Sequence, residues 1–141
     1  MTEIEWNKFD GEYLPTDEDI QNVEKIIGFE FPKDFIEVMK MNDGACPSVR
    51  AFDMLGDESC INNLLSFEES AVQSIVFAYH VVQGRGVKNV YPIARDPFGN
   101  YLCYKKCKFN KLKIVFWNHE KPKKTTELCH SFSEFLDMLH E

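Results

Sequence analysis

The stretch that decides the fold is IARDPFGNYLCY, residues Ile93 to Tyr104, which lies between an apolar run and a lysine-rich one. Asp96, Pro97 and Gly99 stand at the first, second and fourth positions of DPFG, where a type I turn prefers these residue types. The aspartate accepts hydrogen bonds from the backbone, the proline presets φ, and the glycine tolerates a left-handed angle. We therefore predict that Asp96, Pro97 and Gly99 form a structural turn between two strands.

A rival hypothesis compares DPFG with the metal-binding Asp-Phe-Gly of protein kinases. Pro97 separates Asp96 from Phe98, and the sequence lacks both the glycine-rich phosphate loop and the His-Arg-Asp catalytic loop that such chemistry requires. We therefore favour the turn, and expect Asp96→Ala to weaken it by about 1 kcal/mol, as the loss of a helix cap does.

Working outward from the turn, its flanking strands are predicted at residues 90–95 and 100–105. Further strands are predicted at 113–118 and at 49–55, and helices at 17–27, 32–41, 68–83 and 132–139. Thr16 and Gly28 suit the start and the end of the first helix, and Met41 is assigned to the inner face of the second. Ser131 and Glu134 form a capping-box pattern. This order predicts an α+β fold, with a mixed or antiparallel sheet packed against helices, in a single domain over residues 1–141.

The composition is that of a folded protein, because 44% of the 141 residues are apolar and 13% are aromatic. No run of 18 apolar residues occurs, and the first residues are acidic where a secretory signal would be basic. We expect a cytoplasmic protein without a membrane partner. The five cysteines are an odd number without a CxxC pair, which favours reduced thiols over a disulfide framework or a zinc knuckle.

The sequence offers few other chemical motifs. A glycine pair at Gly84 and Gly86 is too short for a phosphate cradle, and no histidine stands four residues after His119 to complete a zinc-hydrolase motif. We predict no catalytic residues, no metal and no cofactor. The lysine-rich run 104–113 could bind nucleic acid, but a net charge of −7 opposes this, and lysines also protect a hairpin edge from aggregation.

Charge is distributed unevenly along the chain. Residues 1–70 carry 17 acidic and 5 basic residues, a net charge of −12, whereas residues 71–141 carry a net charge of +5. An acidic half would attract a basic partner. The acids that we select as candidate partner-binding residues are Asp17, Glu18, Asp19, Asp57, Glu58, Glu68 and Glu69. The alternative is that they cap helices and keep the protein soluble.

Five segments then occur in a characteristic order. They are FEFPKDF (29–35) leading to MNDG (41–44), YPIA (91–94), Asp96 with Gly99 and Asn100, IVFW (114–117) with His119 and Glu120, and SFSEFL (131–136). Together they resemble the SUKH superfamily from about Leu14 to Leu139. The resemblance implies a sheet packed against helices and no catalytic residues.

For bacterial members, the resemblance implies an immunity protein that neutralises a toxin, and many such toxins are nucleases. A nuclease must present a basic surface to phosphates, and an inhibitor can cover that surface with carboxylates. Our leading hypothesis is a non-enzymatic cytoplasmic immunity protein whose partner is a toxin domain with a basic surface, without direct nucleic-acid binding. An adaptor or regulatory module with a cellular protein partner is the alternative, since eukaryotic and viral relatives have such roles.

Overall fold

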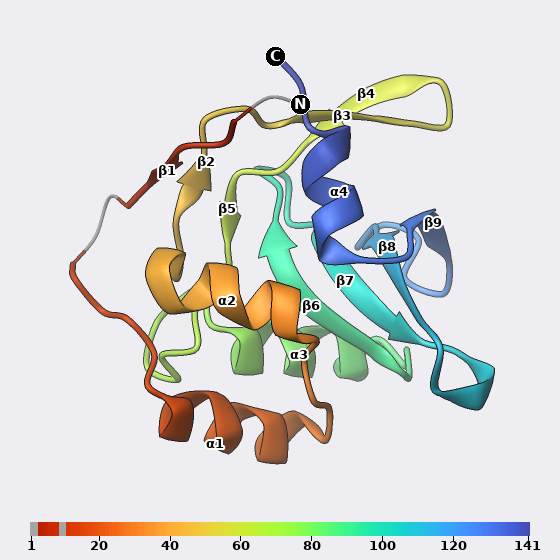
Figure 1. Ribbon diagram of the computed structural model, residues 1–141. Helices are drawn as coiled ribbons and strands as arrows, with labels where there is room; N and C mark the ends of the chain where they lie inside the picture. The colour runs from red at the N-terminus through yellow and green to blue at the C-terminus, as the bar shows by residue number, and fades with distance from the viewer. Residues whose placement is uncertain (1–2, 9–10) are drawn as a thin grey trace.

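The computed structural model describes residues 3–8 and 11–141 (Figure 1). The helices are α1 (Asp17–Ile27), α2 (Lys33–Asn42), α3 (Ile75–Gly84) and α4 (Phe132–Met138). The strands are β1 (Trp6–Asn7), β2 (Cys46–Pro47), β3 (Ala51–Met54), β4 (Asp57–Cys60), β5 (Asn63–Leu64), β6 (Val90–Arg95), β7 (Tyr101–Lys106), β8 (Leu112–Trp117) and β9 (Thr125–Cys129). A short 3-10 turn, η1 (Lys108–Asn110), joins β7 to β8.

Strands β5 to β9 form one sheet in which neighbours along the chain are also neighbours in space. All its pairings are antiparallel, and so are those of two separate ribbons, β1 with β2 and β3 with β4. The predicted α+β fold with an antiparallel sheet packed against helices is therefore confirmed. In the part of the chain that is described, no helix is both long enough and apolar enough to cross a membrane.

The central sheet buries both of its faces, and α2 and α4 lie over one of them (Figure 1). On that face Phe35 of α2 packs edge-on against Phe132 of α4 and against Tyr104 of β7, with ring centroids 5.1 and 5.9 Å apart. The opposite face carries a smaller core that includes Trp117 of β8 and Val82 of α3. Successive side chains of β7 and β8 point to opposite faces of the sheet, so they contribute in turn to the two cores.

The predicted caps account for the ends of two helices. Thr16 and Asp19 form a reciprocal capping box at the start of α1, and Gly28 ends it with φ of 70°. Ser131 accepts a hydrogen bond from the main-chain amide of Glu134 at the start of α4. The strands predicted around the Asp96 turn and at 113–118 are observed within one residue as β6, β7 and β8.

The helix predicted at 68–83 is wrong in its first half, because α3 begins only at Ile75. The Ser74 hydroxyl accepts from the amide of Phe77 at 3.0 Å and caps the helix there. Ser66 closes the preceding loop, since its amide donates to Gln73 and its carbonyl accepts from Ile75. Val72, which lies within the predicted helix but before α3, is 88% exposed.

Two smaller expectations also need correction. Met41, assigned to the inner face of the second helix, is 69% exposed, and Pro32 lies at the N-cap of α2 rather than within its first turn. The strand predicted at 49–55 is shorter, at Ala51–Met54, and pairs with β4, which was not predicted. Strands β1, β2, β5 and β9 were not predicted either.

Candidate functional site

A polar pocket of about 490 Å³ opens beside the end of α2 and the loop that precedes α3. It is lined by Lys8, Tyr13, Asp43, Gly44, Cys46, Asn62, Asn63, Leu64, Ser66, Glu68, Ala71, Val72 and Gln73. We call this hollow the acidic pocket, because the carboxylates of Asp43 and Glu68 line it, and Tyr13 joins it to Asp19 through a hydrogen bond of 3.0 Å.

Asp43 is the buried charge of the acidic pocket, with only 3% of its surface exposed. Its carboxylate accepts from the Ser66 hydroxyl and, at 2.8 Å, from the amide of Phe67. Burial raises the pKa of Asp43, and the charge of Glu68 adds to this rise, while the two hydrogen bonds and Lys8 oppose it. Asp43 thereby ties the end of α2 to a loop more than 20 residues further along the chain.

The Tyr13 hydroxyl lies near three carboxylates. Burial raises the pKa of its hydroxyl most, followed by the hydrogen bond to Asp19 and the charges of Asp19, Asp43 and Glu68. Three carboxylates from three different segments therefore act on one side chain. Such a site favours cationic groups of a ligand or partner.

The acids predicted at the start of α1 have different surroundings. Asp17 forms an ion pair of 2.6 Å with Lys40 of α2. Asp19 serves both the capping box and Tyr13, which lowers the pKa of Asp19. Glu18 and Glu69 are exposed, and Glu68 is half-buried at the pocket. Asp19 and Glu68 both lie close enough to Tyr13 for their charges to raise its pKa. Glu18 and Glu69 are their neighbours in the chain.

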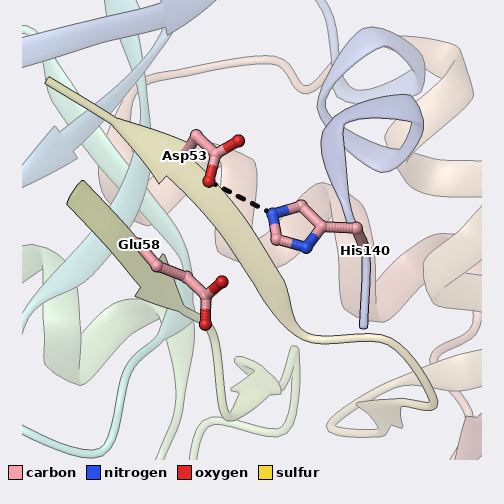
Figure 2. A group of neighbouring side chains, drawn as sticks. All are labelled: Asp53, Glu58 and His140. Carbon is pink, nitrogen blue, oxygen red and sulfur yellow. Dashed lines mark hydrogen bonds and ion pairs between the residues drawn. The ribbon is translucent and has the colours of Figure 1, made fainter. Parts of the chain in front are cut away.

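Asp57 and Glu58 do not join this group. They lie in the β3–β4 ribbon, at the opposite end of the molecule from α1 (Figure 1). Glu58 is gathered instead with Asp53 and His140 (Figure 2). The pKa of His140 is raised by its hydrogen bond to the main-chain oxygen of Glu141 and, to a smaller extent, by Asp53 and Glu58.

The turn at Asp96 is built as its sequence suggests. The Asp96 carboxylate, which is 5% exposed, accepts from the amides of Phe98 and Asn100 at 2.8 Å each, and Gly99 has φ of 89°. Pro97 lies exposed at the second position of the turn. All of the hydrogen bonds that the Asp96 side chain makes are to residues of the same hairpin, which indicates a structural role for Asp96.

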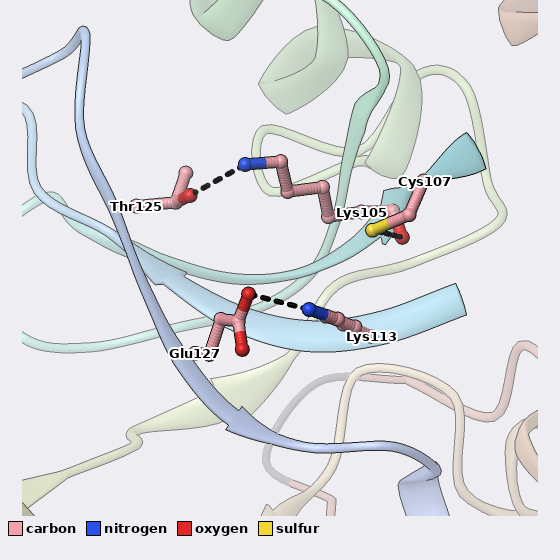
Figure 3. Close-up of polar contacts among 5 residues, drawn as sticks. All are labelled: Lys105, Cys107, Lys113, Thr125 and Glu127. Carbon is pink, nitrogen blue, oxygen red and sulfur yellow. Dashed lines mark hydrogen bonds and ion pairs between the residues drawn. The ribbon is translucent and has the colours of Figure 1, made fainter. Parts of the chain in front are cut away.

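The lysine-rich run forms the end of the β7–β8 hairpin and the adjoining parts of its strands. Figure 3 shows Lys105 donating to Thr125 at 3.2 Å and Lys113 paired with Glu127 at 2.6 Å, so both lysines engage β9. Phe109 at the tip is 92% exposed. The absence of nucleic-acid binding stays a prediction.

The chemistry available at the acidic pocket is that of binding. Among the residues described, no histidine lines it, and its single cysteine, Cys46, has a pKa raised by burial, which keeps the thiol protonated and unreactive. All five cysteines are free thiols, and burial raises the pKa of Cys129 to about 11. Asp43 already uses its oxygens in structural hydrogen bonds.

Sequence reasoning missed Tyr13, Asp43 and His140. In the sequence, Asp43 is only part of the MNDG segment, and nothing in the local pattern shows that Ser66 and Phe67 donate to it. The same holds for His140, which meets Asp53 across 87 residues.

Comparison with known proteins identifies the family of the chain. A search of curated proteins finds no significant match to the chain. The model of the SMI1/KNR4 family (SUKH-1) matches residues 14–138, which include all four helices and every strand except β1. The family resemblance inferred from the five ordered segments is therefore confirmed, and the chain belongs to the SMI1/KNR4 family (SUKH-1).

Proposed function

We propose that this chain is an immunity protein that neutralises a toxin domain by binding a basic surface on it. The observation that carries the proposal is that Asp43 and Glu68 line a surface pocket together with Tyr13, whose hydroxyl donates to Asp19 at 3.0 Å. The SUKH superfamily is known for immunity proteins, which supports this function.

The acidic pocket suits a protein partner because it combines charge with exposed apolar surface. Val72, at its edge, is 88% exposed and offers an apolar contact beside the carboxylates. Charge complementarity chiefly speeds encounter, whereas affinity requires a desolvated anchor. We propose that Glu18, Glu68 and Glu69 speed the encounter with the partner. The acidic pocket supplies the desolvated contact that gives affinity.

The test is co-expression of this chain with the toxic domain encoded beside its gene. We expect growth to be rescued by the parent chain and rescue to be weakened when Glu18, Glu68 and Glu69 are changed together to lysine. The matched control changes Asp57, Glu58 and Asp137 to lysine, which alters net charge equally at exposed positions elsewhere. Failure of the parent chain to rescue growth against any neighbouring toxic domain would contradict the proposed function.

An adaptor that binds a cellular protein is the second candidate, because the matching family is the SMI1/KNR4 branch of the superfamily. The same acidic pocket would serve such a partner. Stable binding of a cellular protein at this pocket, together with no rescue from a toxin, would favour the adaptor over the immunity protein.

A further inference from the structure

Asp53 and Glu58 face each other directly across the β3–β4 ribbon, in a region that the proposed function does not use. Both are exposed. Like charges opposite one another destabilise a strand pair. A cation between these two carboxylates would remove that repulsion.

His140 is held beside the two carboxylates by its backbone. Its amide donates to the carbonyl of Ala51 at 2.8 Å, and its carbonyl accepts from the amide of Ala51 at 3.1 Å. Figure 2 shows its ring turned toward Asp53. The reactive atoms of Asp53, Glu58 and His140 all lie within 4.8 Å of one another.

The hydrogen bonds of His140 fix the role of each ring nitrogen. Nδ1 lies 3.0 Å from the main-chain oxygen of Glu141, which can only accept, so Nδ1 carries a proton. In the neutral ring, Nε2 therefore presents a lone pair to Asp53 Oδ1 at 3.3 Å. Two lone pairs at this distance repel each other unless a proton or a metal ion lies between them.

This arrangement is the one found around metal-binding histidines. A histidine ligand generally donates its second ring nitrogen to a backbone carbonyl or a carboxylate, which orients the ring and raises its basicity. An imidazole with two carboxylates, completed by water, is a donor set that suits Zn²⁺. We propose that Asp53, Glu58 and His140 form a binding site for a divalent transition-metal ion such as Zn²⁺.

The site would join residue 140 to the β3–β4 ribbon. The ribbon lies at the far end of the molecule from α1 (Figure 1), and Asp53, Glu58 and His140 do not line the acidic pocket. Ligands at the surface imply reversible binding, and bound metal should raise the thermal stability of the chain by mass action.

Isothermal titration of the full, reduced chain with ZnCl₂ tests the site. We expect one ion to bind per chain, and His140→Ala and Glu58→Gln each to lower the affinity by at least about tenfold. His80→Ala, at an exposed histidine of α3, is the matched control and should bind as the parent does. No binding by the parent, or equal affinity of the His140 and His80 variants, would overturn the proposal.

Free cysteines are the competing ligands, and Cys60 lies two residues from Glu58 on the same strand. Cys60→Ser should leave Zn²⁺ affinity unchanged. Substitution with Co²⁺ gives a second readout, since thiolate ligands produce a charge-transfer absorption in the near ultraviolet that nitrogen and oxygen ligands do not. We expect that absorption to be absent from the one-to-one complex, and its presence would assign the ion to cysteine instead.

Discussion

The carboxylate of Asp96 accepts both the main-chain and the side-chain amide of Asn100, each at 2.8 Å. The side-chain oxygen of Asn100 in turn accepts from the main-chain amide of His119 at 3.0 Å. A turn that the sequence predicts as a local device is therefore also connected to the segment that follows β8.

Asp96→Ala should lower the free energy of unfolding by about 2–3 kcal/mol, more than the 1 kcal/mol expected for the loss of a cap. The substitution leaves the two Asn100 donors without their acceptor in a buried site. Chemical denaturation measures this loss, and binding to the partner should persist in the folded variant. Unchanged stability together with a lost activity would instead support the catalytic interpretation.

Gly99→Val should also destabilise the hairpin, because Gly99 has φ of 89° and a β-branched residue resists positive φ. Gly99→Ala separates this strain from crowding, since an added Cβ would meet the His119 ring at an ordinary contact distance of 3.6 Å. Gly84→Val, at a glycine without positive φ at the end of α3, is the control. Equal losses of melting temperature in the two variants would show that backbone strain is not responsible.

Asp43→Asn should leave stability at neutral pH equal or higher, whereas Asp43→Ala should lower it by about 2 kcal/mol. Asparagine can still accept from Phe67 and can donate to Ser66, while it removes a buried charge. Burial raises the pKa of Asp43 in the folded state. The folded chain thus holds this proton more tightly than the unfolded chain, and stability attributable to Asp43 falls as pH rises from about 4 through the raised pKa.

Denaturation curves of the parent and Asp43→Asn between about pH 4 and pH 7 check this sign. The variant should lose the decline in stability that Asp43 causes. A variant whose stability follows the parent at every pH would mean that Asp43 titrates in the same range in both states.

Tyr104→Phe should stabilise the protein by up to about 1 kcal/mol. The Tyr104 hydroxyl is buried and has no hydrogen-bond partner among the residues described, and the aromatic rings of Phe29, Phe31 and Phe35 lie nearby. Tyr91→Phe is the control, since its hydroxyl is not among the buried atoms without a partner. A loss of stability in Tyr104→Phe would contradict this account of the hydroxyl.

Local signals predicted much of the fold. The Thr16 cap, Gly28 and the DPFG turn act within a few residues, so their outcome can be derived from the sequence alone. The start of α3 could not be derived in this way, because Val72 lies in an apolar pattern that fits a helix. The helix begins later, where Ser74 caps it and Ser66 forms hydrogen bonds with Gln73 and Ile75. Tertiary hydrogen bonds decided that boundary.

The candidate site was less predictable because its parts come from distant segments. The sequence shows that Asp19 and Glu68 are acidic, but only the fold places both of them beside Tyr13. It likewise separates Asp57 and Glu58 from that group, by placing them in a ribbon at the other end of the molecule (Figure 1). Charge counting thus indicated an acidic half without locating the acidic pocket.

The central claim is that the acidic pocket and its neighbouring carboxylates direct binding to a basic toxin domain. Stopped-flow association with that domain, measured over a series of salt concentrations, tests it most directly. We predict that salt slows association strongly and changes dissociation much less, and that reversing Glu18, Glu68 and Glu69 slows association more than reversing Asp57, Glu58 and Asp137. An association rate that is insensitive to salt, with both triple variants binding like the parent, would contradict the claim and leave the acidic residues a role in solubility alone.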